Sequence, residues 1–391
     1  MARTRGMPRN RSPSPRAGGS IGLRGTGTEV DMGKAGAAWI LLPLCAGLCM
    51  LASCLKGEKV RIAVMTKLEA GSTVGTSEIN AAKLFMEQRG VTGIEVVPVN
   101  DNWDPERSRE ALEEILAQGI RILITSHTST CALAIMDRIN SAPIITFVTG
   151  ATTDRLSKKD DFMFRNVLDV AREQEHIAGE IDRMPGESLL IIRDTMNFGY
   201  TEPALGYVKQ YLRTRICGIM EVRADMLDLP ALQARLAGVS CDKAYLLIGG
   251  YQSLAAGAIA QAVKRRFPAA RIMLTPWVKS PQLVEAGGDA LRDCVLPSHY
   301  PPRGQSASIA RYVETFHGRF GYSPTFISIN MYIALQILSQ AIDAGRRTPQ
   351  EIKSFILEKK TFHTDFLDVR FDEYGDVTIP LYFVTDIAKE F

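Results

Sequence analysis

The chain has 391 residues, more than one hydrophobic core usually needs, so two lobes are the default expectation. Its 46% hydrophobic and 23% charged residues are ordinary for a folded protein. The formal net charge of +3 comes from the first segment. Seven of the 46 basic and two of the 43 acidic residues precede Cys54, which leaves 39 basic against 41 acidic residues. A basic footprint for nucleic acid is therefore not supported, and we expect no such partner.

The N-terminal segment differs in composition from the rest of the chain. Residues 1–31 are rich in Arg, Gly, Pro and Ser and have no hydrophobic period. From Met32, a positive stretch, an apolar run and the tetrapeptide LASC follow one another as in a signal peptide, and the ending resembles the lipobox of bacterial lipoproteins. A membrane helix that stays in the chain is the alternative. We predict an extension and signal peptide over 1–53, lipidation of Cys54, a spacer over 54–58, and a start at Met1 or Met32.

Four cysteines lie in the body of the chain. Their spacing contains no CxxC pair and no zinc pattern, so we expect no metal. They can pair in an oxidising compartment, but the spacing does not demand it, and buried free thiols are the favoured interpretation. These cysteines are Cys131, Cys217, Cys241 and Cys294.

From residue 60 onward, short apolar strands alternate with helical patterns, and the alternation restarts at Ser188. This order is typical of βαβ units and parallel sheets. There is no dinucleotide fingerprint and no P-loop, which argues against a nucleotide-dependent enzyme. We predict strands at 60–65, 94–99, 121–125, 144–148, 189–194, 217–222, 244–249 and 271–275. We predict helices at 77–88, 105–118, 203–213, 229–237, 307–320, 327–344 and 349–358, a turn at 197–199, and a final hairpin that turns at Gly375.

Two neighbouring strands end in loops of small and hydroxyl residues, SHTST at 126–130 and TGATT at 149–153. The first loop opens a helix, and a helix N-terminus offers unpaired N–H groups to an anion. The two loops therefore predict one wall of a pocket for a carboxylate. His127 has no second His or Cys at metal-ligand spacing, so we expect it at the pocket rim. Because there is no GxSxG elbow, we expect no catalytic residues.

Eight short sequences follow one another over residues 60–387. They are IAVMTKLEAG, DNWDPERSREALEEILAQGI, ITSHTST, GATTDRLS, FRNV, LIIRDTMNFG, LIGGYQ and MYIALQILSQAI. In this order they resemble the leucine/isoleucine/valine-binding protein family, the type I periplasmic substrate-binding proteins of branched-chain amino acid ABC transporters. The resemblance implies two doubly wound α/β lobes joined by a hinge, with the ligand between them at the carboxyl ends of the strands. The expected lobes are 59–166 with 299–367, and 167–298 with 368–391.

The resemblance also implies which residues hold the ligand. Ser129 matches the serine that holds the ligand carboxylate, and Thr130 follows it. Tyr251 matches an aromatic residue of the second lobe that lines the cleft. The remaining matches are Gly150, Ala151 and Thr152 in the second loop, and the loop 68–74 with Leu68 and Glu69, which covers the ligand side chain.

Three departures from the family pattern concern the ammonium group of an amino-acid ligand. The acid that meets this group in relatives aligns with Trp277, an aromatic hydroxyl becomes Phe198, and a second acid aligns with either Asp169 or Val170. A buried ammonium without a carboxylate partner costs several kcal/mol. We therefore expect a small carboxylate or amide with an apolar or aromatic body. An α-amino acid whose charge is met by Asp169 or Glu69 stays the alternative.

The expected function is that of a substrate-binding protein at the periplasm or cell surface, anchored by lipid at Cys54. Hinge closure over the ligand would present both lobes to an ABC permease. A ligand-sensing lipoprotein of the same fold, which signals to a receptor, is the alternative. We expect no cofactor.

Overall fold

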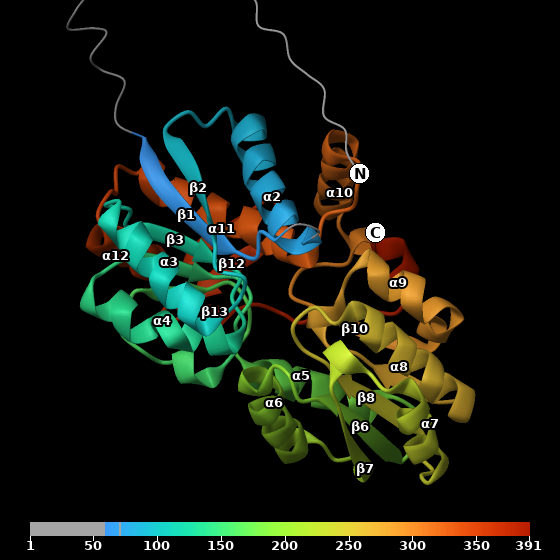
Figure 1. The fold of residues 1–391 in the computed structure, drawn as a ribbon. Helices are drawn as coiled ribbons and strands as arrows, with labels where there is room; N and C mark the ends of the chain where they lie inside the picture. Colours follow the sequence, from blue (N-terminus) through green and yellow to red (C-terminus); the bar gives the residue numbers. More distant parts are fainter. Residues whose placement is uncertain (1–58, 70–71) are drawn as a thin grey trace, which may run out of the picture. The chain divides into compact units, whose positions relative to one another are not determined.

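The computed structural model describes residues 59–69 and 72–391 (Figure 1). The predicted extension, signal peptide and lipidation site at Cys54 lie outside the described residues. The first sheet is entirely parallel and has the strand order β2-β1-β3-β4-β5. Its strands are β1 (Val60–Thr66), β2 (Ile94–Asn100), β3 (Ile122–Thr125), β4 (Ile145–Val148) and β5 (Met163–Arg165).

Helices cover both faces of the first sheet because its strands bury side chains on both sides. Ile62 and Val64 of β1 belong to the core under α2 and α11, whereas the alternate residues Ala63 and Met65 belong to the core under α3 and α4. Helix α11 is buried around almost its whole circumference. The helices are α2 (Thr73–Arg89), α3 (Pro105–Ala117), α4 (Ser129–Ser141), α10 (Ala307–Phe320), α11 (Phe326–Asp343) and α12 (Pro349–Lys359).

The second sheet has six strands in the order β14-β10-β9-β8-β6-β7. Its strands are parallel except β14, which runs antiparallel to β10. The strands are β6 (Ser188–Asp194), β7 (Arg215–Val222), β8 (Lys243–Leu247), β9 (Arg271–Met273), β10 (Cys294–Ser298) and β14 (Tyr382–Val384).

Helices again cover both faces of the second sheet, with α5 and α6 on one face and α7, α8 and α9 on the other (Figure 1). They are α5 (Val170–Arg183), α6 (Phe198–Tyr211), α7 (Leu229–Ala237), α8 (Ser253–Arg266) and α9 (Pro281–Gly287). Short 3₁₀ helices span Asp154–Leu156, Ala224–Met226, Pro276–Val278, Gly288–Asp293, Arg303–Gln305 and Ile387–Glu390. The predicted fold class, two α/β lobes built on parallel sheets, is confirmed.

A small antiparallel sheet near the C-terminus packs against the first lobe. It consists of β11 (Thr361–His363), β12 (Asp368–Phe371) and β13 (Val377–Thr378). The Phe371 ring meets Phe147 and Phe164 of the first lobe edge-on, and Arg165 Nε donates to Asp376 Oδ1 at 3.1 Å. The sequence prediction assigned 368–391 to the second lobe. We propose instead that the boundary follows β13, since only β14 joins the second sheet.

Helix α6 begins earlier than predicted. The turn expected at 197–199 is in fact the helix start, because Phe198 and Gly199 already lie in the first turn and Pro203 lies inside the helix. Gly199 allows α6 to approach α4, since a Cβ there would lie 2.8 Å from Thr130 Oγ1. Helix α5 had no counterpart in the sequence prediction.

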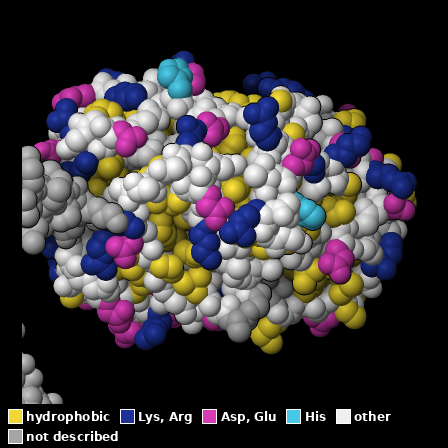
Figure 2. All heavy atoms as spheres, turned by 90° about the horizontal axis from the view of Figure 1, so that it is seen from above, with side chains coloured by type: hydrophobic (Ala, Val, Ile, Leu, Met, Phe, Trp, Pro, Cys, Tyr) yellow, Lys and Arg dark blue, Asp and Glu magenta, His cyan; other side chains and the backbone are white. Residues whose placement is uncertain are grey.

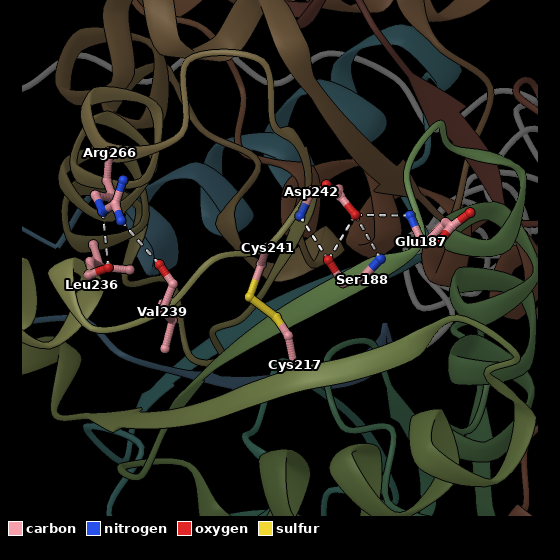
Figure 3. Close-up of a disulfide and its surroundings, with 8 residues drawn as sticks. All are labelled: Glu187, Ser188, Cys217, Leu236, Val239, Cys241, Asp242 and Arg266. Carbon is pink, nitrogen blue, oxygen red and sulfur yellow. Dashed lines mark hydrogen bonds between the residues drawn. A yellow bond between two sulfur atoms is a disulfide. The ribbon is translucent and has the colours of Figure 1, made fainter.

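The structure corrects the expectation that the cysteines are mainly free thiols. Cys217 and Cys241 form a disulfide with Cα atoms 6.2 Å apart (Figure 3). Cys131 and Cys294 are buried and free. Cys217 is the extra residue of a bulge in β7, because Leu189 and Leu190 pair with Ile216 and Gly218. The spacing of the cysteines gave no sign of this bulge.

The residues beside the disulfide are held by hydrogen bonds. Asp242 Oδ2 accepts hydrogen bonds from the backbone N–H groups of Glu187 and Ser188 and from the Ser188 hydroxyl (Figure 3). These bonds fix the segment that leads from Cys241 into β8.

Acidic and basic side chains are interspersed on the face of the described residues drawn in Figure 2, so charge of one sign does not gather there. Within 59–69 and 72–391, no helix has the length and apolar character needed to cross a membrane.

Candidate functional site

A cleft of about 670 Å³ lies where the carboxyl ends of strands from both sheets meet. A narrow inner pocket of about 10 Å³ adjoins it, and five residues line both spaces. These shared residues are Trp103, Thr128, Asn197, Gly250 and Tyr251. Of the predicted ligand residues, the inner pocket brings together Ser129, Gly150, Thr152, Tyr251 and Trp277. The outer cleft is lined by Glu69, Thr130 and Phe198.

The loop between β3 and α4 supplies the polar wall of the inner pocket. Thr128 is the N-cap of α4, and its hydroxyl accepts a hydrogen bond from the Cys131 N–H. Ser129 therefore occupies the first helical position, where its N–H group has no partner within the helix. The Ser129 side chain is buried, and its Oγ accepts a hydrogen bond from the Thr153 N–H at 3.3 Å. This hydroxyl lies at the seam between the two predicted loops.

Gly150 lets the second loop pack against the first. A Cβ at this position would lie 2.6 Å from the carbonyl oxygen of Ser126, a distance that real side chains do not tolerate. Thr152 lines the inner pocket, and its carbonyl accepts a hydrogen bond from the Val170 N–H at 2.6 Å. Ala151 is fully buried in the hydrophobic core and lines neither space.

His127 lines the inner pocket but is buried, whereas the sequence suggested a position at the cleft rim. Its Nε2 lies 2.5 Å from Asp101 Oδ2, and both side chains are inaccessible to solvent. Burial alone would raise the pKa of Asp101, but its interactions with His127 and Ser108 lower that pKa below its usual value. The carboxylate also accepts a hydrogen bond from the Trp103 N–H at 3.2 Å. The Asp101–His127 pair thereby fixes the backbone of two cleft loops.

Glu78 is a second buried acid behind the first-lobe wall. Its Oε2 accepts hydrogen bonds from the hydroxyls of Thr66 and Ser126, whereas its Oε1 has no partner. Burial raises the pKa of Glu78 to about 8 against the opposing effect of these hydrogen bonds. The side chain is therefore a neutral carboxylic acid near pH 7.

Aromatic rings form the opposite wall. Tyr251 follows Gly250 at the end of β8, and both residues have positive φ, 65° and 66°. The Tyr251 ring lies between Trp103 and Phe326, with centroid distances of 5.0 Å to each. Its buried hydroxyl has no hydrogen-bond partner, and burial raises the pKa of Tyr251 well above its usual value.

Trp277 lies deeper in the same wall and is only 5% exposed. Its ring meets Tyr200 and Phe326 edge-on, at 6.0 and 5.6 Å. Phe198 is 63% exposed at the entrance of the outer cleft. The structure thus places two of the three departures from the family pattern, Trp277 and Phe198, at the cleft.

The two acids proposed to meet an ammonium group lie outside the inner pocket. Asp169 is the N-cap of α5 and accepts a hydrogen bond from the Arg172 N–H at 2.8 Å, so its charge is used for the helix and it lines neither space. Glu69 lines the outer cleft, where its carboxylate lies 3.5 Å from Lys67 Nζ. Leu68 donates its N–H to Asn100 Oδ1 and does not line the cleft.

Sequence reasoning missed several residues of the site, above all Trp103, Asn197 and Tyr200. Trp103 and Asn197 follow β2 and β6, so the rule that ligands bind at the carboxyl ends of strands was a usable signal for both. Among the described residues, no Asp or Glu lines the inner pocket, and no group of three or more His, Cys, Asp or Glu is arranged to hold a metal ion. The pocket combines hydroxyl and backbone donors with aromatic surface.

Known proteins share this architecture. Residues 59–387 match the family described as Periplasmic binding protein. A curated relative, the Leu/Ile/Val-binding protein homolog 1 of Brucella abortus (strain 2308), is 23% identical over 324 residues, which cover 81% of this chain and 84% of the relative.

Two solved structures are similar to the described fold. One is a solute binding protein of an ABC transporter from Rhodopseudomonas palustris BisB5 in complex with 3,4-dihydroxy benzoic acid, with a TM-score of 0.73, 17% identity, and coverage of 83% of this chain and 92% of that one. The other is a branched-chain amino acid transporter substrate binding protein from Streptococcus pneumoniae in complex with isoleucine, with a TM-score of 0.75, 15% identity, and coverage of 84% and 96%.

Proposed function

This chain belongs to the periplasmic binding protein family, as the sequence resemblance predicted, and we propose that it delivers a small carboxylate ligand with an apolar or aromatic body to an ABC permease. Family membership gives it the role of a substrate-binding protein of the ABC transporter type, with an extracytoplasmic location. The ligand class, the lipid anchor and the permease partner are our proposals. The observation that carries the proposal is the contrast between the hydroxyl and backbone wall around Ser129 and the aromatic wall around Trp277.

The carboxylate end of the ligand would meet the first-lobe wall. The start of α4 and the loop after β4 meet at Ser129, where two sets of backbone N–H groups and three hydroxyl side chains lie close to the inner pocket. Such a group of donors stabilises an anion without a basic side chain.

The rest of the ligand would meet the second-lobe wall. An α-amino acid needs a partner for its ammonium group, and the inner pocket is lined by Trp277 where amino-acid-binding relatives have an acid. The relative from Rhodopseudomonas palustris was solved with an aromatic acid, and it has the same fold as this chain. The relative from Streptococcus pneumoniae has the same fold and was solved with isoleucine, so the fold admits both ligand classes. The lining of the inner pocket therefore supports an apolar or aromatic acid over a standard amino acid.

We also propose that Cys54 carries a lipid that holds the protein at the membrane after the signal peptide is removed. The disulfide between Cys217 and Cys241 supports an oxidising location such as the periplasm or cell surface. Metabolic labelling with a fatty acid, compared between the parent and the Cys54→Ala variant, tests the anchor. Label in the variant would contradict it.

A thermal-shift screen tests the ligand class. We expect aromatic and aliphatic monocarboxylates to raise the Tm of the purified protein, because a ligand that binds only the native state stabilises it. Leucine, isoleucine and valine are the matched amino-acid set. Stabilisation by these amino acids alone would contradict the proposal.

A further inference from the structure

Trp103 lies at the junction between the outer cleft and the inner pocket. Among the described residues of the first lobe, it is the only aromatic one that lines both spaces, and Thr128 of the proposed carboxylate-binding wall also lines both. A ligand held at the first-lobe wall would therefore have its body beside the Trp103 ring. The residues that place Trp103 in this position belong to the loop between β2 and α3.

The loop holds Trp103 in an unusual backbone conformation. Asn102 and Trp103 have φ values of 53° and 56°, a region that residues other than glycine rarely adopt, least of all bulky ones. The Asp101 carboxylate accepts a hydrogen bond from the Trp103 N–H, and the Trp103 carbonyl accepts one from the Cys131 thiol at 3.0 Å. Backbone strain of this kind persists only where the surroundings enforce it, and it clusters at ligand-binding positions.

The Trp103 side chain offers both a flat surface and a donor. Its ring stacks on Tyr251 of the opposite lobe, with an interplanar angle of 29°. Its indole Nε1 is buried without a hydrogen-bond partner, as is the Tyr251 hydroxyl. Buried indole and phenol donors are usually paired, so these two groups indicate a polar atom that the ligand brings to them.

We propose that Trp103 is a specificity-determining residue that selects planar aromatic acids carrying an oxygen substituent on the ring. The ligand ring packs against the edge of the Trp103–Tyr251 stack, where the indole N–H donates to the substituent oxygen. This inference rests on the proposed function, because the first-lobe wall must hold the carboxylate for the ring to reach Trp103. The competing explanation is that the stack of Trp103 on Tyr251 only holds the two lobes together.

Three probe acids of similar size separate these explanations when their Kd values are measured by isothermal titration calorimetry: 4-hydroxybenzoate, benzoate and cyclohexanecarboxylate. We expect the parent protein to bind the aromatic acids at least tenfold more tightly than the saturated acid, and 4-hydroxybenzoate more tightly than benzoate. Trp103→Leu should weaken both aromatic acids about tenfold and leave cyclohexanecarboxylate within about twofold, because Leu keeps apolar bulk without an aromatic ring for the ligand ring to meet.

Trp103→Phe is the second variant. Tyr374→Leu, in the exposed turn of the C-terminal hairpin, is the control. Phe keeps the ring but lacks the N–H, so we expect recovery of benzoate affinity without the added affinity for 4-hydroxybenzoate. Thermal unfolding of each variant establishes that it is folded. Equal weakening of all three acids by Trp103→Leu, or no weakening of any, would overturn the inference and leave the proposed function intact. If no carboxylic acid binds the parent, the proposed function and the inference both fail.

Discussion

The two walls of the cleft use different chemistry on similar scaffolds. Each wall consists of loops at the carboxyl ends of parallel strands, yet the first lobe presents hydroxyls and backbone N–H groups around Ser129, whereas the second presents the rings of Tyr251 and Trp277. A wall of backbone donors works only if the loops keep one conformation. Aromatic rings bind a ligand through contact area, so small shifts of the rings change the binding little.

The buried groups behind the walls reflect this difference. In the first lobe, Asp101 pairs with His127 and fixes the loops themselves. In the second, Glu173 Oε2 of α5 lies 3.2 Å from Nε2 of His299, which follows β10. Glu173 Oε1 also accepts a hydrogen bond from the Tyr200 hydroxyl at 2.8 Å. One acid–histidine pair therefore holds the polar wall, and the other lies behind the aromatic wall, where the His299 ring meets Trp277 with a centroid distance of 5.5 Å.

Removal of the Glu173 carboxylate should have the largest effect. Glu173→Ala leaves the buried Tyr200 hydroxyl without its acceptor and removes the carboxylate beside His299, so we expect a loss of about 3–5 kcal/mol in the free energy of unfolding. Urea denaturation measures it. Glu175→Ala, on the exposed side of the same helix, is the control and should change little. If Glu173→Ala costs no more stability than Glu175→Ala, the contacts of Glu173 with Tyr200 and His299 are dispensable.

Among the described residues, the disulfide between Cys217 and Cys241 stabilises the second lobe alone. The double variant Cys217→Ala/Cys241→Ala should lose about 2–4 kcal/mol, because the bond closes a loop with a sequence separation of 24 residues. Reductant should lower the urea midpoint of the parent by a similar amount and leave that of the double variant unchanged. If reductant has no effect on the parent, the bond does not contribute to the stability of the second lobe.

Glu78→Gln should stabilise the first lobe, in a way that depends on pH. Burial raises the pKa of Glu78 from 4.5 to about 8, so the native state binds more protons than the unfolded chain between these values. The contribution of Glu78 to stability therefore falls as the pH rises from about 4.5 to about 8, and it levels off above that range.

Glutamine does not titrate and keeps the shape of the protonated acid. We expect the variant to match the parent near pH 4 and to exceed it by on the order of 4–5 kcal/mol at pH 9, measured by urea denaturation. Glu87→Gln, exposed on the same helix, should show no such gain. A parent whose stability does not fall between pH 5 and 8 relative to Glu78→Gln would rule out a buried neutral acid.

Sequence alone located the elements whose signals are local. Helices α7 and α10 have the predicted bounds because Asp228 and Ser306 cap them, as the preference for such residues at helix starts anticipates. Helix α10 also ends before Gly321, which has a φ of 80°. The two hydroxyl-rich loops followed from the same kind of local signal, and the structure places Ser129 and Thr152 from these loops along one pocket.

The parts that the sequence did not reveal depend on contacts between distant segments. Trp103 reaches the site through a strained loop and meets Tyr251, which lies in the other lobe. Cys217 faces Cys241 because a bulge displaces it, and no spacing rule contains that displacement. Asp169 was a plausible ligand until its place as a helix cap was known, since both roles suit an acid that precedes a helix.

Ser129→Ala gives the smallest expected effect and tests the first-lobe wall directly. The hydroxyl lies between the two loops, and as a donor to a ligand carboxylate it would contribute about 1–2 kcal/mol to binding. The variant should therefore weaken benzoate about tenfold, measured by calorimetry, and barely change the Tm of the free protein. Ser141→Ala, at the exposed end of the same helix, is the control and should leave the Kd unchanged. An unchanged Kd for Ser129→Ala would place the carboxylate elsewhere, and the contrast between a polar and an aromatic wall would then no longer describe how the ligand is held.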